Sequence, residues 1–432
     1  MLITSPEQLF AIYKQHPYIS TDSRIAQPGS LFFALKGENF NGNRYSPQAL
    51  ENGAAYVVID DPEYFKGERT LLVEDVLKSL QRLASDYRST LRIPIIGITG
   101  TNGKTTTKEL MAAALSARFT THATAGNLNN HIGVPITLLT IKPETEIAVI
   151  EMGANHIGEI AQLCQIARPT HGIITNIGKA HLEGFGSAEG VIKAKSELYN
   201  HLRTNGGTVF VNADNQLLAA LTADMEKITY GENADANYRG KVDEEGPLLS
   251  FHLLHPAIAE IRTRLAGNYN FENAMAALCI ALHFRVEVTS ACRAIENYEP
   301  RMNRSQVIQT GRNMVIMDAY NANPSSMKAA LINFSATAGQ VKIALLGDMF
   351  ELGNDAPEEH KTVIKLAIER RIDKIITAGP HFAKAAEGQT GVISFLSVSE
   401  LSEYLKSEKL SGATILVKGS RGMKLETIIE NL

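Results

Sequence analysis

Cysteine is scarce in this chain, with Cys164, Cys279 and Cys292 as its three occurrences among 432 residues. The number is odd, and no two of the cysteines have a C-x-x-C spacing. These features argue against a disulfide framework and against a thiolate metal site. We therefore interpret the three cysteines as small residues of the hydrophobic core.

Long apolar runs and a targeting segment are also missing. No run of hydrophobic residues approaches the roughly 20 that span a membrane. Residues 1–7 lack the basic stretch followed by an apolar one with which a secretory signal begins. The formal net charge of −4 and the pI near 6.3 give no general electrostatic footprint for nucleic acid. The sequence predicts a cytoplasmic protein in which local groups hold any anionic ligand.

Length and composition indicate several globular domains. A chain of 432 residues is longer than one hydrophobic core usually supports, and 44% hydrophobic with 20% charged residues is ordinary for a globular protein. Apolar runs that alternate with helical stretches predict α/β domains with mostly parallel sheets. We expect domains at residues 1–88, 89–305 and 306–432, joined by a hinge near residues 300–306. Strands are expected at residues 31–35, 55–59, 93–96, 146–150, 172–175, 208–211, 315–317, 342–346, 374–377 and 414–417, and an amphipathic helix at residues 76–87.

The most informative stretch is a glycine-rich loop at residues 97–107, GITGTNGKTTT. It lies between an apolar run and an apolar helical stretch, which predicts a strand, a turn and a helix. In such a turn the backbone N–H groups and the helix N-terminus cradle phosphates. Lys104 would reach the β- and γ-phosphates, and Thr105 would offer a hydroxyl to Mg²⁺. The strict P-loop pattern requires a glycine where Ile98 stands, so a turn without a ligand is the alternative.

Polar residues follow two of the predicted central strands. Glu151 follows the strand at residues 146–150, and His181 follows the strand at residues 172–175. Because ligands of parallel α/β sheets bind at the carboxyl ends of the strands, we expect both residues to reach one cleft. Glu151 is a candidate ligand for a hard cation such as Mg²⁺, whereas a lone histidine is more often a structural hydrogen-bonding residue.

Several separated motifs together resemble those of the Mur ligases of peptidoglycan synthesis. The motifs are DSR at residues 22–24, LKG at 35–37, GTNGKT at 100–105, GNLNNHIGVP at 126–135, EMG at 151–153, TNIGKAHL at 175–182, AK at 194–195, GNYNFEN at 267–273, DAYNANP at 318–324 and LGDMFELG at 346–353. They extend over nearly the whole chain, and the resemblance is closest to the members that add D-alanyl-D-alanine. It implies a small α/β UDP-binding N-terminal domain, a central P-loop ATPase domain with a parallel sheet, and a C-terminal, Rossmann-like, doubly wound domain.

The resemblance also implies substrate-binding residues. Nucleotide contacts are implied for Gly100, Thr101, Asn102, Gly103, Lys104, Thr105, Thr106, Asn270, Asn273, Arg304 and Asp318. Other substrate contacts are implied for Ser23, Arg24, Lys36, Gly37, Asn127 and Asn130, and motif position indicates Asn321, Asn323 and Asp348 for the dipeptide. From the residues alone, the stretch at 22–24 can equally cap a turn, and Asn270 and Asn273 can be helix caps.

Two Mg²⁺ ions are implied, held by Thr105, Glu151, His181 and Lys195, and the catalytic residues would be Lys104, Glu151, His181 and Lys195. Lys195 aligns with a lysine that is carbamylated in the family. A carbamate presents anionic oxygen atoms to a metal, whereas an ammonium group has no acceptor. Lys193 is the competing choice, and the Ala-Lys pair followed by Ser-Glu-Leu-Tyr favours Lys195.

The reaction that the resemblance implies joins D-alanyl-D-alanine to UDP-N-acetylmuramoyl-tripeptide. ATP would convert the terminal carboxylate of the tripeptide into an acyl phosphate, which the amine of the dipeptide then attacks. The expected product serves cell-wall biogenesis, and with it cell shape and cell division. The expected protein is a monomer without nucleic-acid partners.

Three other functions are alternatives to this one. The related ligase that adds the third amino acid usually carries an Asp-x-Pro-Arg-like motif in its third domain, and residues 306–432 contain none. A folylpolyglutamate synthase would share the central fold but should lack the N-terminal domain with the motif at residues 22–24. A nucleotide-binding regulator without catalysis would have no need for the ligands of a second metal.

Overall fold

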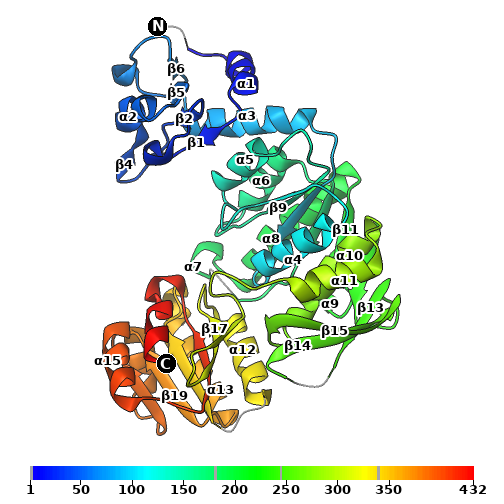
Figure 1. Ribbon diagram of the computed structural model, residues 1–432, viewed down its shortest axis with the longest axis vertical. Helices are drawn as coiled ribbons and strands as arrows, with labels where there is room; N and C mark the ends of the chain where they lie inside the picture. Colours follow the sequence, from blue (N-terminus) through cyan, green and yellow to red (C-terminus); the bar gives the residue numbers. More distant parts are fainter. Residues whose placement is uncertain (1–2, 180–181, 244–245, 338–340) are drawn as a thin grey trace.

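The structure is a computed structural model in which residues 3–179, 182–243, 246–337 and 341–432 are described. Its three α/β units each have their own main sheet and follow one another along the long axis of the molecule (Figure 1). In the described residues, no helix combines the length and the apolar character that crossing a membrane requires. The prediction of three α/β domains is confirmed.

The N-terminal unit contains a four-stranded parallel sheet in the order β1-β2-β5-β6. Its elements are α1 (Pro6–Gln15), β1 (Ile19–Ser20), η1 (Ser23–Ile25), β2 (Leu31–Phe33), β3 (Lys36–Gly37), β4 (Phe40–Asn41), η2 (Gly42–Tyr45), α2 (Ser46–Glu51), β5 (Tyr56–Ile59), η3 (Pro62–Tyr64), β6 (Thr70–Leu72) and α3 (Val76–Thr90). Helix α1 begins at a capping box, in which Ser5 accepts from the Gln8 backbone and Pro6 occupies the first turn. Asp75 caps α3 by accepting from the Lys78 backbone N–H.

The central unit contains a nine-stranded sheet in the order β15-β14-β13-β12-β11-β10-β7-β9-β8. Its elements are β7 (Ile95–Thr99), α4 (Lys104–Ser116), β8 (Thr121–Ala123), α5 (Gly133–Leu139), β9 (Ile147–Glu151), α6 (Glu159–Ala167), β10 (His171–Ile174), α7 (Leu182–Phe185), α8 (Ala188–Asn205), β11 (Thr208–Asn212), α9 (Gln216–Leu221), β12 (Lys227–Gly231), β13 (Tyr238–Val242), β14 (Leu248–His255), β15 (Ala257–Ala266), α10 (Asn270–His283) and α11 (Val288–Asn297). Strands β7 to β13 pair in parallel, as expected. The antiparallel ribbon that β14 and β15 add to β13 was not predicted.

The C-terminal unit contains a six-stranded sheet in the order β16-β17-β21-β18-β19-β20. Its elements are β16 (Gln306–Gln309), β17 (Met314–Asp318), α12 (Pro324–Ala336), β18 (Lys342–Gly347), η4 (Gly353–Asp355), α13 (Ala356–Glu369), β19 (Lys374–Ala378), α14 (Pro380–Ala386), β20 (Val392–Phe395), α15 (Val398–Glu408), β21 (Thr414–Lys418), η5 (Arg421–Met423) and η6 (Leu425–Asn431). Separate apolar clusters cover the two faces of the sheet. One contains residues of α12, α13 and α14, and the other contains residues of α15 and η6, so the unit is doubly wound.

Helix α3 joins the first two units through one continuous core. Leu80 and Leu83 of α3 belong to the same buried apolar cluster as Leu138 of α5. Hydrogen bonds add to this contact, because the Tyr13 hydroxyl donates to the Leu139 carbonyl at 2.7 Å. The domain boundary expected after residue 88 falls within the last turn of α3, and it stays a prediction.

Arg88 at the end of α3 is expected to contribute strongly to stability. It is 8% exposed, and its guanidinium donates to the carbonyls of Ala167, Leu91 and Arg168 at 2.8, 3.0 and 2.9 Å. Arg88→Met would leave carbonyl groups at the end of α6 without these donors, so we expect a loss of about 2–4 kcal/mol in thermal or denaturant unfolding. Arg82→Met on the exposed face of α3 is the matched control, with an expected loss below about 0.5 kcal/mol. Equal losses in the two variants would contradict the role given to Arg88.

The linker between the second and third units has an unusual backbone. Met302, Asn303 and Ser305 have φ angles of +59°, +56° and +50°, although none of them is glycine. Such conformations are uncommon for residues with a Cβ atom and store strain. The strained segment coincides with the hinge expected near residues 300–306.

Candidate active site

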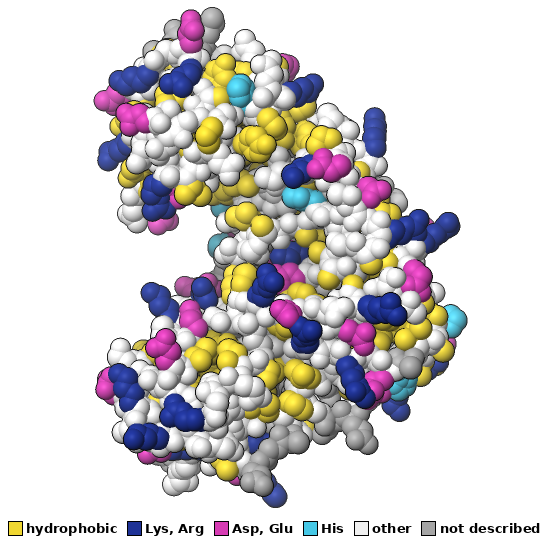
Figure 2. Space-filling view, viewed as in Figure 1, with side chains coloured by type: hydrophobic (Ala, Val, Ile, Leu, Met, Phe, Trp, Pro, Cys, Tyr) yellow, Lys and Arg dark blue, Asp and Glu magenta, His cyan; other side chains and the backbone are white. Residues whose placement is uncertain are grey.

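The candidate site is a cavity of about 760 Å³ between the central and C-terminal units. It lies at the carboxyl ends of the central strands, where parallel α/β sheets bind ligands. The cavity is lined by these residues predicted from the sequence: Thr101, Asn102, Gly103, Lys104, Thr105, Thr106, Asn127, Asn130, Glu151, Asn270, Asn273, Arg304, Asp318, Asn321 and Asn323. His181 lies outside the described residues. In Figure 2 the molecule is hollowed on one side between its N-terminal and C-terminal units.

The glycine-rich loop connects β7 to α4 in a backbone conformation that two glycines permit. Gly100 has a φ of +147°, and a Cβ atom there would lie 2.0 Å from Thr175 Oγ1. Gly103 has a φ of +79°, and a Cβ atom there would lie 2.4 Å from Asn273 Oδ1. The neighbouring strand end also holds the loop, because the Asn102 backbone N–H donates to Asn176 Oδ1 at 2.9 Å. Asn176 lies in the motif at residues 175–182, but its role as a support of the loop was not predicted.

Lys104 is at the first position of α4, with its side chain over the loop. Its Nζ donates to the carbonyls of Gly100 and Thr101 at 2.7 and 3.1 Å. Burial lowers the pKa of Lys104, the nearby charge of Arg304 acts in the same direction, and Glu151 opposes both. The amine therefore lies at the centre of the loop, within reach of a bound phosphate chain.

Glu151 ends β9 as a buried carboxylate that is 1% exposed. Its Oε1 accepts from Thr105 Oγ1 at 3.2 Å and from Asn129 Nδ2 at 2.7 Å. Its Oε2 is also buried and accepts no hydrogen bond from the described residues, and Lys108 Nζ lies 4.0 Å away. A buried carboxylate oxygen that lacks a donor, next to a threonine hydroxyl, suits a hard cation. Asn129 and Lys108 were missed as site residues, although both stand within or beside quoted motifs.

Lys195 is inside the protein, whereas Lys193 is exposed on the same helix, α8. Lys195 is 2% exposed, and its Nζ donates to the Ala154 carbonyl at 3.5 Å. Burial lowers the pKa of Lys195 to about 7, and the charge of Lys104 adds to this effect. Of the two lysines considered, Lys195 is thus the one whose side chain is held inside. Within the described ranges, no three His, Cys, Asp or Glu side chains gather closely enough to hold a metal ion.

The start of α10 connects the loop to the linker. Asn273 Oδ1 accepts from Thr107 Oγ1 at 2.9 Å, and Asn273 Nδ2 donates to Asn270 Oδ1 at 2.8 Å. Asn270 Nδ2 in turn donates to Ser305 Oγ at 3.1 Å, and the Tyr269 hydroxyl lies 3.1 Å from the same oxygen. Both predicted asparagines line the cavity. Their hydrogen bonds also connect α4, the start of α10 and the linker at Ser305.

Two charged groups reach the cavity from the linker and the C-terminal unit. The Arg304 guanidinium stacks on Tyr320, with its central carbon 3.5 Å from the ring centroid. Asp318 Oδ2 accepts from Lys418 Nζ at 2.6 Å. Lys418 is 2% exposed and was not predicted, although it follows the strand expected at residues 414–417 and is the register partner of Asp318.

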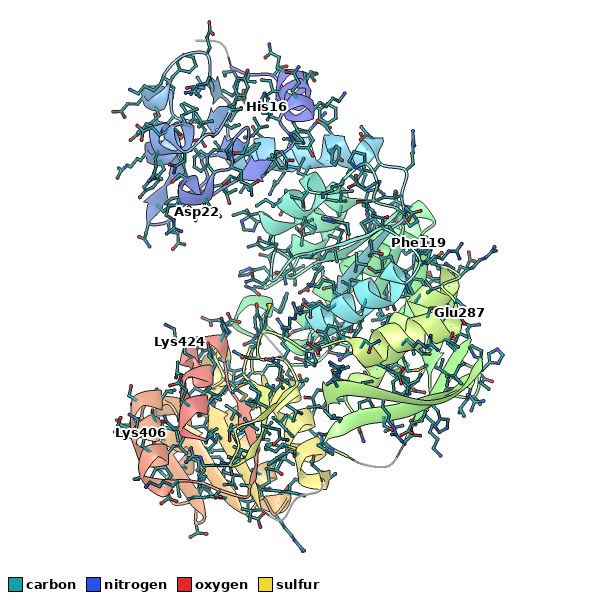
Figure 3. The ribbon with its side chains drawn as sticks, viewed as in Figure 1. His16, Asp22, Phe119, Glu287, Lys406 and Lys424 are labelled. Atoms are coloured by element: carbon teal, nitrogen blue, oxygen red, sulfur yellow. The ribbon has the colours of Figure 1, made fainter. Side chains whose placement is uncertain are left out.

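Several predicted residues do not line this cavity. Asp348 is fully buried, and its carboxylate accepts from the backbone of His381 and Phe382 at 3.0 and 2.8 Å. Both oxygens are therefore engaged at the start of α14, away from the cavity, and the expected dipeptide contact stays a prediction. Arg24 is paired with Asp22 at 2.6 Å on the N-terminal unit. Asp22 lies across the hollow from Lys424 of the C-terminal unit (Figure 3).

The remaining predicted substrate residues, Ser23, Lys36 and Gly37, also belong to the N-terminal unit. Ser23 Oγ donates to Gln48 Oε1 at 2.9 Å. Lys36 Nζ forms an ion pair with Asp60 at 2.8 Å and keeps a side chain that is 46% exposed. The structure thus divides the predicted substrate residues between the N-terminal unit and the cavity.

Comparison with known proteins gives consecutive family matches along the chain. The model for the catalytic domain of the Mur ligase family matches residues 17–96, the Mur ligase middle domain matches residues 98–281, and the glutamate ligase domain of Mur ligases matches residues 303–421.

Individual relatives match nearly the full length of the chain. The UDP-N-acetylmuramoyl-tripeptide–D-alanyl-D-alanine ligase of Bacillus subtilis is 36% identical over 96% of this chain and 92% of the relative. The enzyme of the same name from Escherichia coli is 34% identical over 96% of this chain and 93% of the relative. The crystal structure of MurF from Acinetobacter baumannii is 33% identical, with a TM-score of 0.87 over 96% of this chain and 93% of that chain. This chain belongs to the Mur ligase family.

Proposed function

We propose that the chain is an ATP-dependent ligase that joins D-alanyl-D-alanine to UDP-N-acetylmuramoyl-tripeptide in peptidoglycan precursor synthesis. Relatives named for this activity match almost the whole chain. The observation that carries the proposal is that one cavity is lined both by the phosphate loop and by polar residues of the C-terminal unit. A two-step ligase needs its activating site next to the site of its amine substrate.

In the first step, an oxygen of the tripeptide carboxylate attacks the γ-phosphorus of ATP. An O–P bond forms, the bond from the γ-phosphorus to its bridging oxygen breaks, and ADP leaves. Because both reactants are anionic, Lys104 and the N–H groups at the start of α4 stabilise the developing charge. In the second step, the amine of the dipeptide attacks the acyl carbon, loses a proton, and displaces phosphate.

The donor set supports the use of Mg²⁺ during this reaction. Thr105, Glu151, His181 and a carbamate on Lys195 would hold two ions, which when bound neutralise phosphoryl oxygens and align them. Glu151 Oε2 accepts no hydrogen bond from the described residues, which fits its assignment as a metal ligand. A carbamate would give Lys195 the anionic oxygens that its ammonium form lacks.

The other substrate groups are assigned by unit. Asn270, Asn273, Arg304 and Asp318 would contact ATP, together with residues 100–106 of the loop. Ser23, Arg24, Lys36 and Gly37 would hold the UDP part of the muropeptide on the N-terminal unit, and Asn127 and Asn130 would contact the same substrate at the cavity. Asn321 and Asn323 would contact the dipeptide from the C-terminal unit.

We further propose that the enzyme acts as a cytoplasmic monomer whose C-terminal unit closes by rotation at residues 300–306. The positive φ angles in this linker support a hinge, since hinge residues absorb large backbone changes. Small-angle scattering should show compaction when ATP analogue and muropeptide bind. An unchanged radius of gyration would contradict the closure.

Phosphate release from ATP tests the proposed function. We expect release with UDP-N-acetylmuramoyl-tripeptide and D-alanyl-D-alanine, and much less when the dipeptide is omitted. Release supported by a single amino acid, and not by the dipeptide, would contradict the assignment.

A further inference from the structure

The side chain of Asn102 extends from the phosphate loop to the C-terminal unit. Its Nδ2 donates to Ser325 Oγ at 3.0 Å, and its Oδ1 accepts from Asn323 Nδ2 at 2.8 Å. Ser325 Oγ completes the set by donating to Asn323 Oδ1 at 2.9 Å. These three residues, which we call the loop bridge, connect positions more than 200 apart in the sequence.

The other polar groups of Asn102 are engaged inside the central unit. Its backbone N–H donates to Asn176 Oδ1 at 2.9 Å, and its carbonyl accepts from Thr175 Oγ1 at 2.6 Å. The backbone is therefore fixed to the end of β10, while both ends of the side-chain amide are used by the C-terminal unit. This arrangement indicates that the side chain serves the contact between units and not the direct binding of phosphate.

On the opposite side, the bridge coincides with the beginning of α12. Asn323 is the N-cap of this helix, because its Oδ1 also accepts from the Ser326 backbone N–H at 2.9 Å. Pro324 then fixes the first turn. Asn321 precedes the cap and Asp318 ends β17, so a shift of the helix start would displace the cavity wall that these residues form.

Close packing beside the bridge restricts its position. A Cβ atom at Gly178 would lie 2.9 Å from Ser325 Oγ, so the strand end of the central unit approaches Ser325 closely. An ion pair between Lys179 and Glu359, at 2.9 Å, is another contact between the same two units. The Lys179 side chain is 61% exposed, so this ion pair contributes little positional restraint compared with the partly buried bridge.

We propose that Asn102 and Ser325 are positioning residues that align the C-terminal unit with the phosphate loop for attack of the amine. The inference rests on the proposed function, in which the acyl phosphate forms at the loop and the C-terminal unit holds the amine. A misalignment of about 1 Å between reacting groups can cost about 100-fold in rate. The bridge supplies the alignment through hydrogen bonds that contact neither reacting group.

Ser325→Ala tests the bridge. We expect kcat for the complete reaction to fall about 10- to 100-fold, with the KM for ATP changed less than about 3-fold. Asn102→Ala should have a similar effect, and the double variant should lose little more than the stronger single variant, because both substitutions remove the hydrogen bond between Asn102 and Ser325. Ser335→Ala on the same helix is the matched control, because Ser335 Oγ donates to the Ile332 carbonyl at 2.7 Å within α12. This control should retain wild-type kinetics.

Hydrogen exchange gives a readout that does not depend on activity. The backbone amides of residues 322–323 and 325–327 should exchange faster in Ser325→Ala than in the wild type, and Ser335→Ala should leave them unchanged. Three results would each contradict the proposed role of the loop bridge. They are a wild-type kcat in Ser325→Ala, unchanged hydrogen exchange in that variant, and losses in kcat that multiply in the double variant. Failure of the wild type to release phosphate with the proposed substrates would instead refute the proposed function, and the exchange experiment would still report on the bridge.

Discussion

A Gly100→Ala substitution is expected to lower kcat/KM for ATP by at least about 100-fold. The added Cβ atom would lie 2.0 Å from Thr175 Oγ1 and 3.1 Å from the Thr175 backbone nitrogen, so the loop or the end of β10 must shift. Either shift would displace the loop N–H groups that are proposed to surround the phosphates and would move Lys104 away from its place over the loop. Steady-state phosphate release and calorimetric ATP binding measure this loss.

The matched control for this substitution is Gly206→Ala. Gly206 also has a positive φ, of +66°, but a Cβ atom there meets nothing within 4 Å. We expect a loss of about 1 kcal/mol in stability from the backbone strain and kinetics close to wild type. Wild-type ATP kinetics in Gly100→Ala would contradict the tight contact with Thr175.

The Lys195→Met variant is expected to lose about 10³-fold in kcat, because it removes the side chain proposed to carry a metal-binding carbamate. In that modification the neutral amine attacks the carbon of CO₂, an N–C bond forms, and a proton leaves. Burial lowers the pKa of Lys195 to about 7, so the neutral amine forms much more readily near neutral pH than it does on an exposed lysine. As the pH falls below this value the amine becomes protonated, and both carbamate and activity should decrease.

Labelling with ¹³C-bicarbonate distinguishes the carbamate from a purely structural role of Lys195. A carbamate resonance should appear in the wild type and in Lys193→Met, whose side chain is exposed two residues away on α8, and it should be missing in Lys195→Met. Lys193→Met should also keep wild-type kcat. Identical spectra for the two variants would rule out Lys195 as the modified residue.

Much of the fold could be predicted because each buried strand is a short apolar run in the sequence. The runs at residues 146–150 and 342–346 became β9 and β18, and the loop at residues 97–107 connects β7 to α4 as expected. Parallel strands are buried on both faces, so they give near-continuous apolar runs. The ribbon of β14 and β15 was missed because its burial is mixed and its residues carry no comparable run.

Site residues could be predicted where a sequence motif indicates their chemistry. Site residues were missed where side chains from distant segments of the chain come together. Glu151 ends β9 and Lys104 begins α4, and both line the cavity, as their positions indicated. Lys418 contacts Asp318 because β21 pairs with β17. The two residues are 100 positions apart, and the sequence does not show which strands are neighbours. The dipeptide contact expected for Asp348 stays a prediction, and the sequence did not indicate that this carboxylate accepts from the backbone at the start of α14.

The continuous core beneath α3 limits how this enzyme can be recombined with its relatives. A chimaera that joins the first 88 residues of one relative to the remainder of another would combine two halves of one hydrophobic core, since α3 packs in the same cluster as α5 and α6. Its apolar side chains would meet surfaces shaped for a different helix, and overpacking and voids would follow. The N-terminal and central units should therefore be exchanged together, and an exchange of the C-terminal unit needs to match the linker, the loop bridge and contacts such as the hydrogen bond from the Asn268 backbone to Asn333.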